Sequence, residues 1–240
     1  WYESFENFYD GLLQVANMQR FFKEHSAGFH TADAKGIWKE YTESYYQMDT
    51  FYRLFHLSFQ KSLETSNILL DDLFKHVADK VEGLYSHWFL GGLGNNWSDV
   101  CADELEQFGK VLEIAKQEDF YRSRIKNSDT RVFVIISDAL RYEVAASLAD
   151  QLRRETQSKV SLSSMQSIFP SITKFGMAAL LPHKELSAEV RNDILTVFAD
   201  AQSTASTNRD RVLKNENPSS VALQYKNSLG MKRAERSALV

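Results

Sequence analysis

The sequence predicts a protein of two parts, a helical bundle followed by an α/β region with a mainly parallel sheet. In the first half, apolar residues recur at steps of three and four, which places them on one face of a helix. After a polar turn at residues 127–130, a short apolar run rich in β-branched residues begins at Val132. Strand-like and helix-like patterns then alternate, as in parallel α/β sheets. We therefore expect a helical domain over residues 1–126 and an α/β domain over residues 127–240.

Four apolar stripes predict the helices of the first domain. They cover residues 5–13, 38–59, 69–88 and 101–115. The second stripe is mostly aromatic, which indicates core packing rather than a cofactor site, because aromatic side chains bury a large area. Cys101, in the fourth stripe, is expected to be a small core residue. The glycine- and asparagine-rich residues 91–96 are expected to end the third helix.

The second domain is expected to alternate strands and helices. The uninterrupted run at residues 132–136 predicts a strand covered on both faces. Helical spacing predicts helices over residues 142–152 and 176–181, and Pro218 is expected to open another over residues 221–229. Residues 160–165 and 194–198 are predicted to be the second and third strands.

Composition excludes several classes of protein. With 43% hydrophobic and 25% charged residues, the 240-residue chain is typical of a globular protein and not of a disordered one. No apolar run is long enough to cross a bilayer, so we expect no membrane association. One cysteine cannot build a disulfide framework, which favours a cytoplasmic location. The chain begins with Trp1 and not with methionine, so we expect a piece of a longer protein.

Asp138 is the first candidate for chemistry, because it follows the predicted strand at residues 132–136 by two positions. Ligands of parallel α/β sheets gather at the carboxyl ends of the strands. A carboxylate there can bind a divalent cation through oxygen. Asp is also a common helix cap, and a helix is expected to begin near Leu140. Position alone leaves both roles open.

Thr173 is the second candidate, in the segment Pro170-Ser171-Ile172-Thr173-Lys174. It precedes a predicted short helix, and a helix N-terminus gathers free N–H groups that favour phosphate. A threonine hydroxyl there can attack phosphorus when a metal lowers its pKa. Ser171 is the competing hydroxyl. The alternative is again a capping role, which the residues by themselves favour.

Three segments resemble the PglZ family. They are residues 134–143 (Val-Ile-Ile-Ser-Asp-Ala-Leu-Arg-Tyr-Glu), residues 167–183 (from Ser-Ile-Phe-Pro-Ser-Ile-Thr-Lys to Leu-Leu-Pro-His) and residues 200–204 (Asp-Ala-Gln-Ser-Thr). The resemblance covers roughly residues 130–240. PglZ proteins belong to the alkaline phosphatase superfamily and to bacterial phage-defence systems of the BREX kind. The resemblance implies that residues 127–240 are the N-terminal part of an alkaline-phosphatase-like domain.

The resemblance also implies an activity, which is metal-dependent hydrolysis of phosphoesters. The enzyme would be a phosphatase or a phosphodiesterase, and a nuclease is one of the options. In that interpretation Thr173 is the nucleophile and a metal ligand, and Asp138 binds one of two divalent ions, zinc or manganese. Lys174 and Phe175 would bind phosphate, with Ser171 and His183 as weaker candidates. The implied partners are other phage-defence proteins and a phosphoester substrate, nucleic acid among the options.

The superfamily site needs further Asp and His ligands, and this sequence stops before them. After Thr173 it contains only one histidine, His183, and no Asp-His pair. We therefore expect residues 1–240 to be catalytically inactive by themselves. The alternative interpretation is a catalytically inactive scaffold or interaction subunit of a defence complex.

Overall fold

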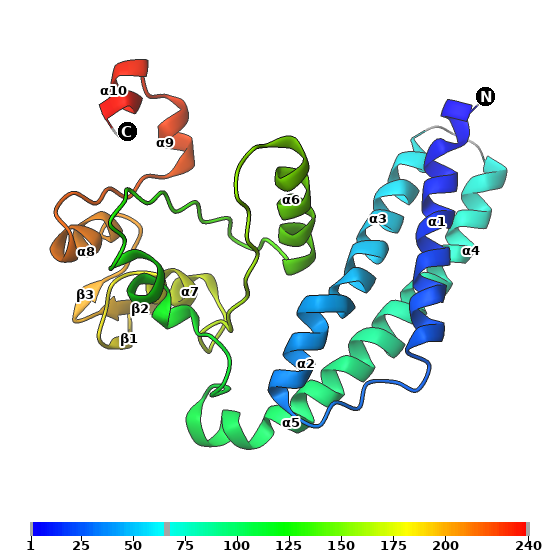
Figure 1. Ribbon diagram of the computed structural model, residues 1–240, viewed down its shortest axis with the longest axis horizontal. Helices are drawn as coiled ribbons and strands as arrows, with labels where there is room; N and C mark the ends of the chain where they lie inside the picture. Colours follow the sequence, from blue (N-terminus) through cyan, green and yellow to red (C-terminus); the bar gives the residue numbers. More distant parts are fainter. Residues whose placement is uncertain (1, 65–67, 239–240) are drawn as a thin grey trace. The chain divides into compact units, whose positions relative to one another are not determined.

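The chain folds into two compact units that interleave along the sequence. The computed structural model describes residues 2–64 and 68–238. Unit 1 comprises residues 1–113 and 139–164, and unit 2 comprises residues 114–138 and 165–240. Figure 1 traces both units along the chain. The domain division between residues 126 and 127 stays a prediction.

Unit 1 is helical. Its elements are α1 (Tyr2–Glu24), α2 (Ala34–Glu40), η1 (Tyr41–Tyr45), α3 (Tyr46–Leu63), α4 (Ile68–Gly83), η2 (Leu84–Gly91), α5 (Gly92–Phe108) and α6 (Tyr142–Glu155). The helices predicted over residues 5–13, 38–59 and 142–152 are confirmed. The side chain of Leu69, in the third stripe, lies outside the described residues. Among the described residues, no helix combines the length and apolar character needed to cross a bilayer.

The core of unit 1 lies between α1, α3 and α4. The aromatic stripe supplies much of it, as predicted, because Tyr45, Met48 and Phe55 are all buried. Phe74 of α4 is fully buried and packs edge-on against the Phe55 ring, with centroids 5.8 Å apart. Cys101 is also buried, as expected for a small core residue.

The glycine-rich segment 91–96 does not end a helix, and this prediction was wrong. η2 and α5 continue through it with helical backbone angles at Gly91 and Gly92. A Cβ atom at Gly92 would lie 3.2 Å from the Phe29 ring, so glycine serves close packing there. The helix ends instead at Gly109, whose φ of 65° is left-handed and whose N–H donates to the Leu105 carbonyl. The fourth predicted helix therefore stops short of residue 115.

Unit 2 combines short helices with a small sheet. Its elements are η3 (Gln117–Asp119), η4 (Tyr121–Ile125), α7 (Thr173–Ala179), β1 (Leu186–Arg191), β2 (Ile194–Ala199), β3 (Gln202–Ser203), α8 (Arg209–Glu216), α9 (Tyr225–Leu229) and α10 (Arg233–Ala238). A small buried cluster is formed by Leu181, Ala199 and Val212. Pro218 lies in a turn and opens no helix, which corrects that prediction.

The sheet in the described residues is antiparallel, in the order β1-β2-β3. β2 confirms the strand predicted over residues 194–198. Two-residue turns reverse the chain on either side of it, at Asn192-Asp193 and Asp200-Ala201, all four residues having positive φ. These tight turns leave no room for a crossover helix, so the mainly parallel sheet that we predicted is not formed by the described residues.

The first two predicted strands are extended chain and not parts of a sheet. Residues 132–136 and 160–165 have no ladder partner among the described residues. One isolated parallel bridge, between Lys116 and Gln166, follows the second segment. Both predictions of a strand were therefore wrong for this structure, because a strand needs a neighbour to satisfy its backbone hydrogen bonds.

Candidate active site

Unit 2 brings together the two residues that the sequence singled out. The Thr173 hydroxyl donates a hydrogen bond to Asp138 Oδ2 at 3.1 Å, although the residues are 35 positions apart. Thr173 is the first residue of α7, and Asp138 lies with Ala139 in the turn that follows the extended segment. Ala139 has a φ of 59°, a conformation that costs an alanine about 1 kcal/mol. A tight turn at Asp138 and Ala139 therefore ends the extended segment.

Neither side chain caps a helix, so the capping alternatives do not describe this structure. α6 begins at Tyr142, and its N-cap residue is Arg141, without a side-chain cap. The N-cap of α7 is Ile172, whose side chain cannot accept a hydrogen bond. Both side chains are exposed and bond to each other.

The neighbouring candidates have other contacts within unit 2. The Lys174 ammonium donates to the Leu195 carbonyl of β2 at 2.9 Å. The Phe175 N–H donates to the Ile172 carbonyl at 3.0 Å, so that amide is already used. Within the described chain, the N–H groups of Thr173 and Lys174 donate no hydrogen bond. Phosphate binding by Lys174 and Phe175 stays a prediction, as does the competing role of Ser171.

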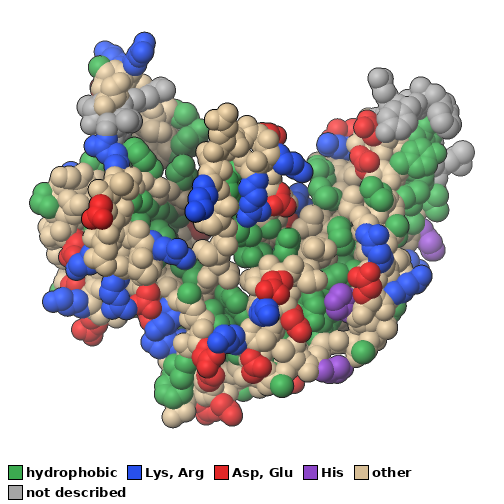
Figure 2. Space-filling view, in the orientation of Figure 1, with side chains coloured by type: hydrophobic (Ala, Val, Ile, Leu, Met, Phe, Trp, Pro, Cys, Tyr) green, Lys and Arg blue, Asp and Glu red, His purple; other side chains and the backbone are tan. Residues whose placement is uncertain are grey.

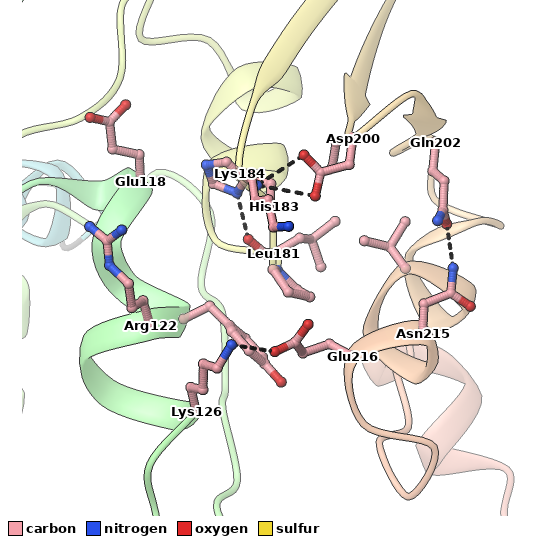
Figure 3. Close-up of a pocket in the computed structure, with 14 residues that line it drawn as sticks. Glu118, Arg122, Lys126, Leu181, His183, Lys184, Asp200, Gln202, Asn215 and Glu216 are labelled. Atoms are coloured by element: carbon pink, nitrogen blue, oxygen red, sulfur yellow. Dashed lines mark hydrogen bonds and ion pairs between the residues drawn. The ribbon is translucent and has the colours of Figure 1, made fainter.

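His183 lies in a pocket of about 370 Å³ (Figure 3), and neither Asp138 nor Thr173 lines that pocket. Its Nδ1 is 2.7 Å from the Leu181 carbonyl, so Nδ1 carries the proton. Asp200 lines the same pocket and accepts hydrogen bonds from the Lys184 and Glu185 amides. These backbone hydrogen bonds hold the pKa of the Asp200 carboxyl below its usual range, and the bond from Glu185 has the larger effect. Asp200 thus fixes the end of β2 to the start of β1.

The donor set around Asp138 is incomplete for a metal. Among residues 2–64 and 68–238, no group of three or more His, Cys, Asp or Glu side chains is placed to hold an ion. Asp138 and Thr173 offer two oxygen donors, which suit a hard divalent cation but do not fill its coordination sphere. A metal site that uses Asp138 stays a prediction.

Unit 1 contains a buried polar network that no sequence pattern predicted. The Asp49 carboxylate is 2% exposed and accepts hydrogen bonds from the Tyr41 hydroxyl at 2.7 Å and the Tyr85 hydroxyl at 2.5 Å. The Arg141 guanidinium donates to the same carboxylate at 2.9 Å. Asp49 follows Tyr45 by four residues, on the buried face of the helix. A carboxylate on an apolar stripe was the signal that could have revealed the network.

A second buried carboxylate continues this network. Glu143 of α6 is fully buried and accepts a hydrogen bond from Arg53 of α3 at 2.8 Å. The Arg141 Nε lies 3.9 Å from Glu143 Oε1, an oxygen without a hydrogen-bond partner among the described residues. Both arginines therefore compensate charges that would be costly alone in the interior. The network fixes α6 against α3.

The tyrosines of the network act as hydrogen-bond donors. Burial, followed by the hydrogen bond to Asp49, raises the pKa of Tyr85 to about 12. Burial and the negative charge of Asp49 raise the pKa of Tyr41 still further. Both phenols therefore stay protonated across the physiological range and can donate to Asp49.

Comparison with known proteins places the second half of the chain in an alkaline phosphatase-like class. Residues 119–240 match the family described as the BREX system PglZ alkaline phosphatase-like domain. The chain therefore belongs to the PglZ family.

Two curated relatives align over almost the whole chain. The alkaline phosphatase-like protein BrxZ of Escherichia coli O9:H4 (strain HS) is 36% identical over 239 residues, which is 97% of this chain. The alkaline phosphatase-like protein PglZ of Bacillus cereus (strain H3081.97) is 33% identical over 239 residues, or 98% of this chain. The chain spans only 27% of the length of either relative. No solved structure matches it significantly.

Proposed function

We propose that this chain supplies part of the active site of a metal-dependent phosphoester hydrolase in a BREX phage-defence system. The observation that carries the proposal is the hydrogen bond from the Thr173 hydroxyl to Asp138. It places a nucleophile-type oxygen and a carboxylate side by side, and neither has a capping role. Family membership supports the reaction class, because the family is described as alkaline phosphatase-like.

In the proposed reaction, the Thr173 oxygen attacks phosphorus in line with the leaving group. The new Thr173–phosphorus bond forms as the bond from phosphorus to the leaving oxygen breaks. Thr173 loses its hydroxyl proton, and the leaving alkoxide gains one, so the leaving group departs as an alcohol. Water then cleaves the phosphothreonine, which restores the hydroxyl and releases phosphate or a phosphomonoester. The N–H groups of Thr173 and Lys174 point from the first turn of α7, where they can bind phosphoryl oxygens.

Asp138 has two compatible tasks in this site. It orients the Thr173 hydroxyl, as the 3.1 Å hydrogen bond indicates, and it would be one ligand of a divalent metal, zinc or manganese. A bound metal would supply charge neutralisation and a lower hydroxyl pKa. Its remaining ligands would have to come from outside residues 1–240, so we expect the chain by itself to be inactive.

The test uses a full-length protein in which residues 1–240 replace the aligned region of the Escherichia coli BrxZ relative. Hydrolysis of p-nitrophenyl phosphate and bis-p-nitrophenyl phosphate is measured with zinc, with manganese and with a chelator. We expect metal-dependent turnover that both Asp138→Ala and Thr173→Ala remove, while Ser171→Ala, a matched hydroxyl control, retains it. Turnover that survives Thr173→Ala would refute the assignment of the nucleophile.

An inactive scaffold of a defence complex is the second candidate. In that case the full-length protein would lack turnover with every metal. Its folding and its association with other BREX proteins would be unaffected by Thr173→Ala.

A further inference from the structure

The pocket of unit 2 is a second candidate for ligand binding, because neither Asp138 nor Thr173 lines it. Its volume is about 370 Å³, and part of its lining is apolar, since the buried cluster of Leu181, Ala199 and Val212 contributes to it. Pockets for small molecules measure roughly 300–1,000 Å³ and combine apolar surface with a few polar groups. This pocket therefore has the size for one small molecule, and its polar groups decide which kind.

The charged groups of the pocket balance one another. The lining contains three basic and three acidic side chains, which are Arg122, Lys126, Lys184, Glu118, Asp200 and Glu216. Lys126 forms an ion pair with Glu216 at 2.8 Å, and the Lys184 and Glu185 amides bind the Asp200 carboxylate. Basic and acidic side chains are also interspersed on the face drawn in Figure 2. Charge alone therefore does not select a ligand, and recognition has to come from neutral groups.

Two neutral side chains at one side of the pocket leave a donor and an acceptor unused. Asn215 Nδ2 of α8 donates a hydrogen bond to Gln202 Oε1 of β3 at 2.9 Å. This bond leaves Gln202 Nε2 as a donor and Asn215 Oδ1 as an acceptor, and neither atom has a partner among the described residues. Figure 3 shows both side chains across the pocket from Arg122 and Lys126. A donor beside an acceptor complements the edge of a nucleobase such as adenine, whose amino group donates and whose ring nitrogen accepts.

Tyr121 of η4 adds an unused hydroxyl to the pocket. The side chain lines the pocket and is only 7% exposed. Its hydroxyl makes no hydrogen bond with the described residues, whereas the hydroxyl of a buried tyrosine usually has a partner. Burial, followed by the negative charge of Glu216, raises the pKa of Tyr121, and the charge of Lys126 opposes this, so the hydroxyl lies close to that ion pair. A hydroxyl without a partner in so buried a position points to a ligand that supplies one.

We propose that this pocket binds a nucleobase, as part of a nucleoside or nucleotide, at a site separate from Asp138 and Thr173. The apolar lining would contact the flat ring, and the Gln202–Asn215 pair would bind its donor–acceptor edge. The Tyr121 hydroxyl would form a hydrogen bond with the ligand on the side of η4. A free nucleotide and a base of a single-stranded nucleic acid offer the same ring and the same edge, so the experiment has to distinguish these two sources.

Calorimetric titration tests the proposal with the full-length chimaera, in which residues 1–240 replace the aligned region of BrxZ. Adenosine, AMP, inorganic phosphate and a short oligodeoxyadenylate are titrated in the presence of a chelator. We expect adenosine and AMP to bind, and purine riboside, which lacks the amino group of adenosine, to bind about tenfold more weakly. An oligonucleotide that binds more tightly than AMP would identify a nucleic-acid strand as the source of the base, and weaker binding would identify the free nucleotide. Binding of phosphate alone, or of none of these compounds, would overturn the proposal.

Matched variants locate the binding. Asn215→Ala and Tyr121→Phe each remove one hydrogen-bonding group and should weaken the binding of AMP about three- to tenfold. Arg211→Ala is the control, because Arg211 is an exposed residue of the same helix as Asn215 and does not line the pocket. Tyr121→Phe should leave the melting temperature without ligand unchanged, since the hydroxyl has no partner among the described residues, so weaker binding there cannot be ascribed to misfolding.

The same variants define the result that would contradict the pocket as the site. AMP binding that is unchanged in Asn215→Ala and Tyr121→Phe, or that is lost in Thr173→Ala, would place the base elsewhere in the protein. None of these measurements requires turnover by Thr173. The nucleobase proposal and the proposed hydrolysis can therefore fail separately.

Discussion

Replacement of Asp49 by alanine should destabilise unit 1 strongly. The change leaves three donors without their acceptor: the Tyr41 hydroxyl, the Tyr85 hydroxyl and the Arg141 guanidinium, which lie 2.7, 2.5 and 2.9 Å from the carboxylate. Each orphaned donor in a buried site costs about 1–3 kcal/mol. These contributions are not additive within one network, so we expect a total near that of a broken buried pair, about 3–5 kcal/mol.

Tryptophan fluorescence is the suitable assay, because all four tryptophans precede residue 113 and so report on unit 1. Urea unfolding of the parent is compared with Asp49→Ala and with Asp150→Ala. Asp150 forms an exposed ion pair with Arg153 on α6, and its loss should change the free energy of unfolding by less than about 0.5 kcal/mol. A loss below about 1 kcal/mol for Asp49→Ala would refute the stabilising role of the network.

Three further predictions concern the stability of the chain. The pKa of Tyr85 is raised from 10.0 to about 12 in the folded chain, so the unfolded chain loses this proton at lower pH. The free energy of unfolding should therefore fall as the pH rises from 10 to about 12. Tyr85→Phe should make this fall smaller when urea unfolding is measured as a function of pH. Ala201→Gly should increase the free energy of unfolding by up to about 1 kcal/mol and so raise the melting temperature, because Ala201 has a left-handed φ of 66°. A lower melting temperature would contradict this prediction. Gly11→Ala should lower the free energy of unfolding in urea by about 1–3 kcal/mol, because the new Cβ atom would lie 2.5 Å from the Phe74 ring. Gly83→Ala is the control and should not lower it, because a Cβ atom there meets open space. Equal effects of the two substitutions would contradict the packing argument.

The helices were the most predictable part of the fold. The stripe at residues 38–59 has a regular three-and-four spacing, and its helix depends mainly on side chains that the pattern itself contains. The glycine cluster at residues 91–96 led to a wrong prediction, because the sequence does not distinguish a glycine required for packing against Phe29 from a glycine that ends a helix. Gly109, which does end a helix, is marked only by its left-handed φ.

The strands were less predictable, because a strand is defined by its partner. The apolar run at residues 132–136 has the composition of a covered strand, and the described residues contain no neighbour for it. The antiparallel turns at Asn192-Asp193 and Asp200-Ala201 lack glycine, which is the usual sequence sign of such turns, so β1 was missed.

The sequence singled out two residues that lie together, and their roles stay predictions. Asp138 and Thr173 were chosen from strand and helix boundaries together with the family resemblance, and the structure brings them into hydrogen-bond contact. The network around Asp49 was not found, because its three partners, in η1, in η2 and directly before α6, are far apart in the sequence and share no motif.

The most direct test of the proposed function is to trap the covalent intermediate. The full-length chimaera is quenched with acid during turnover of a phosphoester, and peptides spanning residues 167–183 are examined by mass spectrometry. We predict the mass of one added phosphoryl group on Thr173, and its loss in Thr173→Ala. Turnover with an unmodified Thr173, or with the phosphoryl group on Ser171, would contradict the assignment of Thr173 as the nucleophile.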